Sequence, residues 1–351
     1  MAETAEAGGA SELRGHRRWA CPLLAIAAMA ATLPLVAGYW GALHPAFDAL
    51  VHFRFHLAAL VALLALPLLF FRGWRQIALM ALVLSAGAVG STLTYGGGGL
   101  AVAAVSQEPS ARYRLLHLNL RYDNATPKAV LSLIGHSNAD VVVLTEVSDM
   151  WRAELAFIEG AYPHRIVCRA RAHIGGVAIL SRRPFRHPAA TACLDRGSMA
   201  TASISLGGNT ITVAALHLGW PWPFDQHEHV NRVRPALASL GPTAILAGDF
   251  NASPWSVTTR MVEAAGGLTA PRWVGPTWLK RPLPDFLRRY AGLPIDHILT
   301  KGRVRTLSIE RLEDVGSDHL PVLMSFEIEP GSEEQPIMQA RTSVKQSYIP
   351  E

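Results

Sequence analysis

Several apolar runs of the sequence end on side chains that can bind a metal ion or move a proton. An amide ends the run at residues 114–119, a carboxylate follows residues 141–145, and a histidine ends residues 210–217. An Asp-Phe-Asn triplet lies just after residues 244–247, and two Asp-His pairs stand beside short apolar runs near the C-terminus. Because strand ends are where α/β proteins place their ligands, this pattern indicates one shared site. The candidate residues are Asn119, Glu146, His217, Asp249, Asn251, Asp296, Asp318 and His319.

Each of these residues also has an ordinary structural explanation. An Asp or Asn at a strand end is more often a turn former, and a single histidine is more often structural than a base. Glu146 by itself could cap the segment that follows it. Turn formation alone, however, would rarely place the whole set in this order beside strands. The set favours a metal-dependent hydrolytic site, since Mg²⁺ needs only one or two carboxylates together with water and substrate phosphate.

The sequence argues against several other kinds of site. Only three cysteines are present, one of them inside an apolar stretch, which disfavours a zinc site held by thiolates. The chain has no P-loop and no Gly-x-Ser-x-Gly nucleophile motif. The net charge of +5 comes largely from scattered arginines, so it is only a weak sign of nucleic-acid binding. Cys168 and Cys193 either pair or stay as two separate buried thiols, and the sequence leaves both alternatives open.

The motifs that contain the candidate residues resemble those of the endonuclease/exonuclease/phosphatase superfamily, which includes DNase I-like nucleases, inositol-polyphosphate phosphatases and neutral sphingomyelinases. The resemblance covers nearly all of residues 111–328 and none of the N-terminal apolar part. It implies a four-layer α/β sandwich, in which two packed β-sheets are flanked by helices. It also implies a divalent cation, usually Mg²⁺, with Mn²⁺ or Ca²⁺ as alternatives. The motifs are LLHLNL, VVVLTEV, ALHLG, LAGDFNASP, PIDHILT and GSDHLPV.

The resemblance further implies roles for oxygen-bearing residues around the metal. Glu146 is similar to the principal metal ligand of the family, and Asn119 and Asp318 are similar to residues at or next to the metal. We therefore expect these three side chains to form the metal site.

The same resemblance implies a group of residues that handle the phosphate and the attacking water. His319 is similar to the base or phosphate-binding imidazole, and Asp296 to the carboxylate that orients it. His217 corresponds to a second histidine near the metal and the phosphate. Asp249 is expected to position or deprotonate the water, and Asn251 to hold a phosphoryl oxygen. Whether Asp249 or His319 is the base stays open, because family members differ in this respect.

The C-terminal part of the chain alternates between strand-like and helix-like segments. Helices are predicted over residues 126–136, where Pro127 is well placed to begin one, and over residues 228–240. Many strands with few helices are typical of two packed sheets with helices outside. The predicted strands cover residues 114–119, 141–145, 176–180, 203–206, 210–217, 244–247, 296–300, 305–311 and 321–328.

Three apolar stretches precede this part, at residues 20–40, 57–71 and 77–93. The first and third have about the length that a helix needs to cross a bilayer, whereas the second is short. Arginines cluster at residues 14–18 and 72–75. Since positive residues favour the cytoplasmic side, we expect about three transmembrane helices, a cytoplasmic N-terminus and a C-terminal domain outside the cytoplasm. Two helices, or a cleaved signal peptide at the first stretch, are the alternatives.

Half of the residues are hydrophobic and only 17% are charged, against about a quarter in soluble proteins, which supports a multi-pass membrane protein. The bilayer is therefore one expected partner and a phosphoester substrate the other, and the sequence points to no protein partner. We divide the chain into a cytoplasmic N-terminal segment (1–19), a transmembrane region (20–95), a linker (96–110), a catalytic domain (111–328) and a disordered tail (329–351).

The loops that would select the substrate carry a weaker signal. An aromatic loop at residues 220–224 follows His217, and a segment rich in tryptophan and arginine at residues 273–290 precedes Asp296. Aromatic rings could stack on a base or sugar, or enter the membrane interface. We rank a nuclease-like phosphodiesterase slightly ahead of a lipid or small-molecule phosphodiesterase or phosphatase at the membrane surface. A non-catalytic binding domain is the third alternative, and the intact set of polar residues argues against it.

Overall fold

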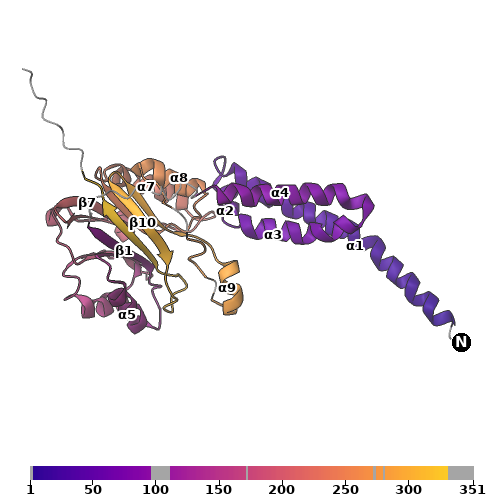
Figure 1. Cartoon of the computed structure of the whole chain (residues 1–351), viewed down its shortest axis with the longest axis horizontal. Helices are drawn as coiled ribbons and strands as arrows, with labels where there is room; N and C mark the ends of the chain where they lie inside the picture. Colours follow the sequence, from indigo (N-terminus) through magenta and orange to yellow (C-terminus); the bar gives the residue numbers. More distant parts are fainter. Residues whose placement is uncertain (1–2, 96–110, 171–172, 272–273, 280, 331–351) are drawn as a thin grey trace, which may run out of the picture.

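The computed structural model is an elongated molecule in which a bundle of helices projects from an α/β domain (Figure 1). The linker expected at residues 96–110 and the tail from residue 331 onward lie outside the part of the chain that the structure describes. The described residues are 3–95, 111–170, 173–271, 274–279 and 281–330.

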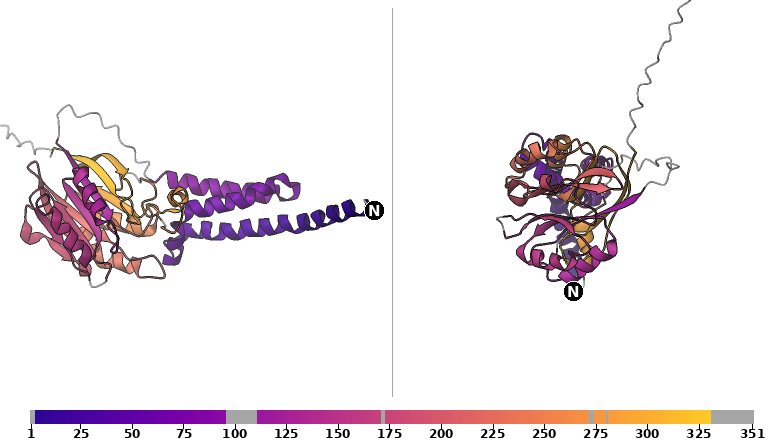
Figure 2. Two further views of the ribbon diagram at one scale, coloured as in Figure 1. Left: turned by 90° about the horizontal axis from the view of Figure 1, so that it is seen from below. Right: turned by 90° about the vertical axis from the view of Figure 1, so that its left-hand side faces the viewer.

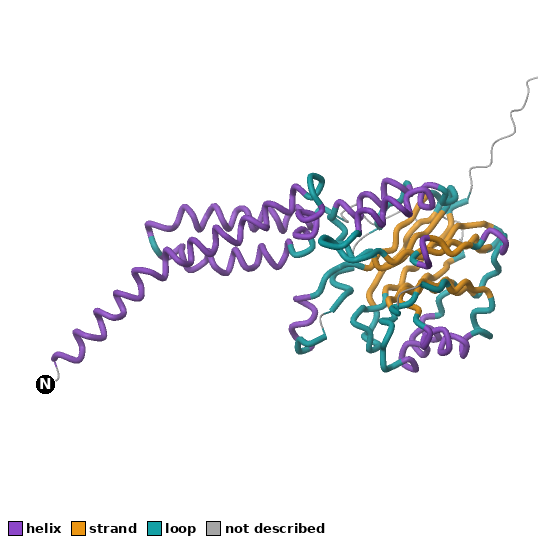
Figure 3. Tube along the Cα trace, turned by 180° about the vertical axis from the view of Figure 1, so that it is seen from behind, coloured by secondary structure: helices purple, strands orange, loops and turns teal. Residues whose placement is uncertain are grey.

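Two sheets of mixed strand direction form the centre of the α/β domain (Figure 3). The first sheet has the strand order β10 (Val304–Arg311), β11 (Val322–Ile328), β1 (Arg112–Asn119), β2 (Val141–Val147), β4 (Gly176–Ser181) and β3 (His164–Val167). The second has the order β5 (Ala192–Leu194), β6 (Met199–Leu206), β7 (Asn209–His217), β8 (Ala244–Asp249) and β9 (Asp296–Lys301). The edge strands β3 and β5 were not predicted, because segments of four and three residues carry too little periodicity.

Apolar side chains bury both faces of each sheet. The inner faces pack on each other through a cluster that includes Val143, Ile179 and Val213. Separate apolar clusters lie between each outer face and its helices. The helices are α5 (Pro127–Ser137) and α6 (Asp149–Glu154) on the first sheet, and α7 (Gln226–Ala238) and α8 (Val257–Gly266) on the second. These layers confirm the predicted four-layer α/β sandwich.

The register of the strands aligns their polar ends, so that in each sheet these residues lie side by side at the same end of neighbouring strands. β1 and β2 are parallel, and Asn119 lies opposite Thr145. β7 and β8 are also parallel, with His217 opposite Asp249. β9 is antiparallel to β8 and begins where β8 ends, so Asp296 lies opposite Asp249. The pairing therefore aligns three candidate residues in one row across the second sheet.

A disulfide joins the edges of the two sheets. Cys168 directly follows β3 in the first sheet, Cys193 lies in β5 of the second, and their Cα atoms are 5.5 Å apart. The sequence left this pairing open, and the structure decides it in favour of the bond. The two sheets are thus linked covalently at the edge where both have their shortest strands.

The N-terminal part forms a bundle whose helices run side by side (Figures 1 and 2). A short helix lies at the end of the bundle nearest the α/β domain, and another projects from the domain beside that end (Figure 1). The bundle consists of α1 (Glu3–Ala37), α3 (Arg54–Ala65) and α4 (Arg75–Leu93), and the two short helices are α2 (Pro45–Val51) and α9 (Asp285–Ala291).

Two helices of the described part could cross a membrane on their own, and a bent pair could be a third, where about three were expected. Two segments in the described part of the chain are long and apolar enough on their own, Trp19–Trp40 and Arg72–Leu93. The middle stretch qualifies only when α2 is counted together with the helix after it, and the two meet at a bend of 68°. Pro67 has no amide hydrogen, and the chain changes from α to 3-10 geometry at this point. Two of the about three expected spanning helices are therefore present as single helices, and the middle stretch is long enough to cross only as a bent pair.

Candidate active site

Asn119 links the two sheets by hydrogen bonds at the point where their polar strand ends meet. Its side-chain nitrogen donates to Glu146 Oε1 over 3.0 Å and to Asp249 Oδ2 over 2.9 Å. Its oxygen accepts from the backbone amide of Arg121 at 2.9 Å. Asn119 is fully buried, so this arrangement is rigid. The amide therefore holds the two carboxylates beside each other and, in this arrangement, turns its own oxygen away from them.

Glu146 stands at the end of β2 in an uncommon backbone conformation. Its φ is +57°, a left-handed conformation that non-glycine residues rarely adopt, and the pairing of β2 with β4 is irregular between Leu144 and Val147. The carboxylate is partly exposed, and its second oxygen accepts from the backbone amide of Tyr122 at 3.0 Å. Strained residues of this kind persist where the surrounding structure holds them, and they concentrate at functional sites.

Asp249 and Asn251 are fixed by the turn that follows β8. Asp249 Oδ1 accepts from the backbone amide of Asn251 at 2.8 Å. Asn251 has a φ of +48°, and its side-chain nitrogen donates to the carbonyl of Leu218 at 2.9 Å. The Gln226 amide donates to the carbonyls of Phe250 and Asn251, both at 3.0 Å. The turn is therefore tied to the segment after β7 and to α7.

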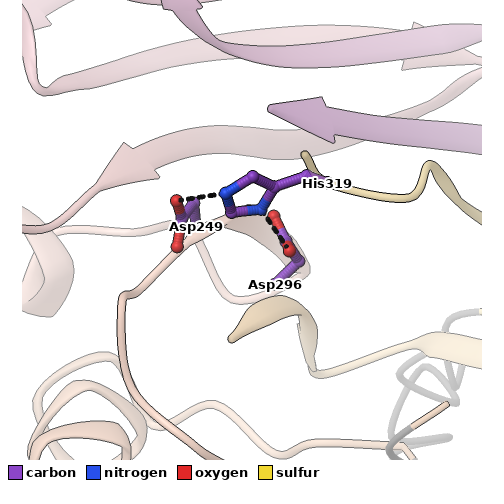
Figure 4. Close-up of side chains that lie close together, drawn as sticks. All are labelled: Asp249, Asp296 and His319. Carbon is purple, nitrogen blue, oxygen red and sulfur yellow. Dashed lines mark hydrogen bonds and ion pairs between the residues drawn. The ribbon is translucent and has the colours of Figure 1, made fainter. Parts of the chain in front are cut away.

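His319 lies between two buried carboxylates (Figure 4). Its Nδ1 is 2.8 Å from Asp296 Oδ2, and its Nε2 is 3.6 Å from Asp249 Oδ2. Burial alone would lower the pKa of His319, but the charges of Asp296 and Asp249 outweigh this effect and raise the pKa to about 10. The imidazole therefore carries a proton at neutral pH.

The two carboxylates respond to this environment in opposite directions. Burial raises the pKa of Asp249, and the nearby charge of His319 only partly offsets that increase. Burial also acts to raise the pKa of Asp296, but the charge of His319 and the hydrogen bond from His117 outweigh it and hold the pKa well below its usual range. Asp296 is thus the permanent anion of the pair, and Asp249 is the better proton acceptor.

His117 belongs to this network and was not among the predicted site residues. Its Nε2 is 2.9 Å from Asp296 Oδ1, and its Nδ1 is 3.2 Å from the carbonyl of Val143. The Asp296 carboxylate is therefore held between His117 and His319. Side chains two positions apart on a strand share a face, so the spacing of His117 from Asn119 could have revealed it.

The remaining predicted residues lie at different distances from the cluster of Asp249, Asp296 and His319. His217 Nε2 is 3.7 Å from Asp249 Oδ2, which places it in the same cluster. Asp318 is partly exposed, and the described residues provide no hydrogen bond or ion pair to its side chain, although its charge contributes to the raised pKa of His319. Trp273 and Lys280, which belong to the segment considered for substrate binding, lie outside the described residues.

The described side chains offer two places for a divalent cation. Asp249, Asp296 and His319 each bring one ligand atom within 4.8 Å of the others. Both oxygens of Asp296 are hydrogen-bonded to imidazoles, however, and His319 is protonated, so this group is better suited to proton handling. Glu146 keeps a partly exposed carboxylate beside Asn119 and Asp249, and such hard oxygen donors fit Mg²⁺.

Comparison with known proteins gives a family match and several structural similarities. No curated protein matches the sequence. An endonuclease/exonuclease/phosphatase from Beutenbergia cavernae DSM 12333 is similar at 22% identity, covering 62% of this chain and 72% of its own, with a TM-score of 0.48. Staphylococcus aureus beta toxin with bound magnesium ions is 15% identical over 62% of this chain and 100% of its own, with a TM-score of 0.48. D. rerio TDP2, complexed with a single-strand DNA product, is 15% identical over 62% and 99%, with a TM-score of 0.49.

The family assignment rests on the sequence match. The sequence model of the Endonuclease/Exonuclease/phosphatase family matches residues 116–319, which is more than half of the chain. This range begins in β1 and ends on His319, so it includes every candidate residue of the site. Members of this superfamily are hydrolases that act on phosphoester bonds. The chain belongs to the endonuclease/exonuclease/phosphatase family.

Proposed function

We propose that this protein hydrolyses a phosphodiester with the help of a divalent cation. The observation that carries the proposal is the convergence at Asp249, which accepts a hydrogen bond from Asn119 and faces the imidazoles of His217 and His319. The Glu146 carboxylate is joined to the same point through Asn119. A carboxylate that favours protons, a charged imidazole and a hard-oxygen metal ligand are the groups that such a hydrolysis requires.

Glu146 is the residue we assign to the cation, with Asp318 as a further oxygen donor. Asn119 takes part through its hydrogen bonds to Glu146 and Asp249, because its own oxygen accepts from the amide of Arg121. When bound there, Mg²⁺ would polarise a phosphoryl oxygen and offset the negative charge that develops on it. The protein supplies the rest of the site. The backbone amides of Arg121 and Tyr122 hold Asn119 and Glu146 in place, so neither side chain has to reorganise when substrate binds.

For the proton transfer, we assign the base to Asp249 rather than to His319. Asp249 has a raised pKa and can take a proton from the attacking water, whereas His319 already carries one. The His319 imidazolium then stabilises negative charge on the phosphoryl group, and Asp296 holds the ring in position through Nδ1. Asn251 and His217 are assigned to the non-bridging phosphoryl oxygens. The sequence left the base open between Asp249 and His319, and Asp249 is the one we propose.

We also propose that the catalytic part lies outside the cytoplasm. The Cys168–Cys193 disulfide supports this side, because such bonds persist mainly in oxidising compartments. Arg72 and Arg75 support it as well, since they lie at the turn between α3 and α4, at the end of the bundle far from the domain (Figure 1).

The test uses the full chain reconstituted in lipid nanodiscs, with bis(4-nitrophenyl) phosphate as a soluble diester. Turnover is expected with Mg²⁺, should disappear with EDTA and should return when Mg²⁺ is added back. His319→Ala should lower the rate by about 10²- to 10⁴-fold. His136→Ala changes an exposed histidine on α5 and is the matched control, which should keep the wild-type rate. Turnover that survives both EDTA and His319→Ala would contradict the proposal.

A further inference from the structure

A buried carboxylate from the helical part fixes the catalytic domain to the bundle. Asp48 lies in α2 and is almost fully buried. Its oxygens accept from the backbone amides of Val257 at 2.7 Å and Thr258 at 3.0 Å, in the first turn of α8. They also accept from the Thr258 hydroxyl at 2.9 Å and lie 3.2 Å from His227 Nε2 of α7. A negative charge at a helix N-terminus is favourable, so this contact is a specific attachment.

Two further contacts of the same segment reach the turn that carries the catalytic residues. His52 Nδ1 accepts from the backbone amide of Ser253 at 3.1 Å, and Trp255 Nε1 donates to the carbonyl of Val51 at 2.7 Å. Ser253 is four residues after Asp249. Since a chain advances at most about 3.6 Å per residue, Asp249 lies within about 15 Å of this interface. The reacting centre is therefore held close to the end of the bundle.

The aromatic loop after His217 touches the same end of the bundle. The Trp222 ring lies 6.3 Å from the ring of His44, just before α2. Trp220, Trp222 and Phe224 are all exposed, although they are large apolar residues. A loop of this composition in water is unfavourable unless it has a partner.

Other exposed apolar side chains lie near the same end of the bundle, next to the α/β domain. α9 projects beside the end of the bundle, as the views in Figures 1 and 3 agree. The first candidate membrane span ends at Trp40, so a bilayer crossed by this span would have its surface at the residues directly after it. Aromatic side chains are favoured at that depth. The exposed residues on α9 are Phe286, Leu287 and Tyr290, and those at the end of the bundle are Tyr39, Trp40, Leu43 and Phe53.

We infer that these side chains and the loop at residues 220–224 form a surface that contacts the bilayer, and that the substrate is a phosphodiester in the headgroup of a membrane lipid. The inference rests on the proposed hydrolysis. The contacts of Asp48 and Trp255 hold the polar strand ends, which carry the candidate site, close to the end of the bundle. Lipid headgroups would lie at this end. A nucleic acid would have to enter between these strand ends and the bilayer, so the lipid now ranks ahead of the nuclease alternative.

The proposed reaction is a hydrolysis and needs no co-reactant besides water. The water oxygen forms a bond to phosphorus, and one P–O ester bond of the headgroup breaks. The water proton passes to Asp249, and the leaving oxygen is protonated to an alcohol. Cleavage on the glycerol side leaves diacylglycerol in the membrane and releases a phosphorylated headgroup. Cleavage on the other side leaves phosphatidic acid and releases the headgroup alcohol.

The experiment compares three substrates for the full chain in vesicles of phosphatidylglycerol and phosphatidylcholine with Mg²⁺. Lipid products are quantified beside hydrolysis of bis(4-nitrophenyl) phosphate and of a single-stranded oligonucleotide. We expect lipid cleavage to exceed oligonucleotide cleavage. The double variant Trp220→Ala/Phe224→Ala should lower the ratio of lipid to soluble-diester turnover by about tenfold or more, because each exposed aromatic loses its contact with the bilayer.

Phe157→Ala is the matched control for this variant. Phe157 is an exposed aromatic residue beside α6, on the layer that covers the first sheet, whereas α7 and α8 contact the bundle from the layer on the second. Its substitution should leave the ratio unchanged. Cleavage of the soluble diester without cleavage of either lipid would overturn the lipid inference alone, as would faster cleavage of the oligonucleotide. Failure to cleave any of the three substrates would instead count against the proposed hydrolysis itself.

Discussion

The substitution Asp48→Asn tests whether hydrogen bonds from α8 to Asp48 attach the α/β domain to the bundle. The first amides of a helix have no acceptor within the helix, and in α8 these are Val257 and Thr258. Asp48 accepts from both, one on each carboxylate oxygen. The next amide, that of Thr259, is capped locally by the Ser256 hydroxyl at 3.0 Å. Protection of the first two amides from hydrogen exchange therefore depends on a residue some 200 positions away in the sequence.

The expected magnitude follows from these contacts. The side-chain amide introduced by Asp48→Asn would turn an NH₂ group toward at least one of the donors, which removes a hydrogen bond to a charged group worth about 1.5–3 kcal/mol. Since about 1.4 kcal/mol corresponds to a factor of ten, exchange of these amides should accelerate about 10- to 100-fold. Asp48→Ala removes the acceptor of all four partners and should cost about 3–5 kcal/mol, which corresponds to roughly 10²- to 4 × 10³-fold.

Hydrogen exchange of the full chain in detergent, followed by mass spectrometry of peptides that cover the start of α8, measures this effect. Asp149→Asn is the control, because Asp149 is also an acidic residue in the first turn of a helix but is 87% exposed. It should leave exchange at Val257 and Thr258 unchanged. Unaltered protection of these amides in Asp48→Asn would refute the attachment and, with it, the presentation of the site to the bilayer.

Three further predictions concern the site and the sheets. Asp296→Asn should lower kcat on the soluble diester by about 10³- to 10⁴-fold, because the neutral amide removes the negative charge that keeps His319 protonated; a normal rate would remove Asp296 from the mechanism. The pKa of His319 is raised from 6.5 to about 10, so its stabilising contribution is complete below pH 6.5 and is lost as the pH rises through 10. The melting temperature of the wild type should therefore exceed that of His319→Gln most below pH 6.5, and a constant difference across this window would contradict the charge assigned to His319. The double variant Cys168→Ser/Cys193→Ser opens a link across 25 residues and should destabilise the protein by about 3 kcal/mol, visible as a melting temperature about 6–12 °C lower; an unchanged melting temperature would show that the bond adds nothing to stability.

Much of the architecture follows from local sequence patterns. A run such as residues 141–145 is apolar at nearly every position, which predicts a strand buried on both faces, and β2 is such a strand. Pro127 begins α5 as expected. The polar side chains at strand ends were also visible, because hydrophobic periodicity stops where they occur. These signals are local, so a single sequence is enough to read them.

Other features depend on contacts between distant segments. The pairing of Cys168 with Cys193 requires the edges of two sheets to meet, which neither cysteine's neighbours indicate. The segment before the middle apolar stretch was read as a loop, yet it contains α2, whose Asp48 is bound by the α/β domain. α8 was not predicted, and its first turn is completed by an acceptor from that distant segment.

The sequence by itself determined the family, the order of the strands along the chain and the residues that could perform the chemistry. The tertiary structure decided how these residues divide the work. His319 is protonated because Asp296 and Asp249 flank it. Asp296 stays ionised despite its burial because the charge of His319 and the hydrogen bond from His117, on the other sheet, lower its pKa. A pKa depends on charges and burial in space, and the residues that set these values are up to about 200 positions apart in the chain. No local pattern carries that information.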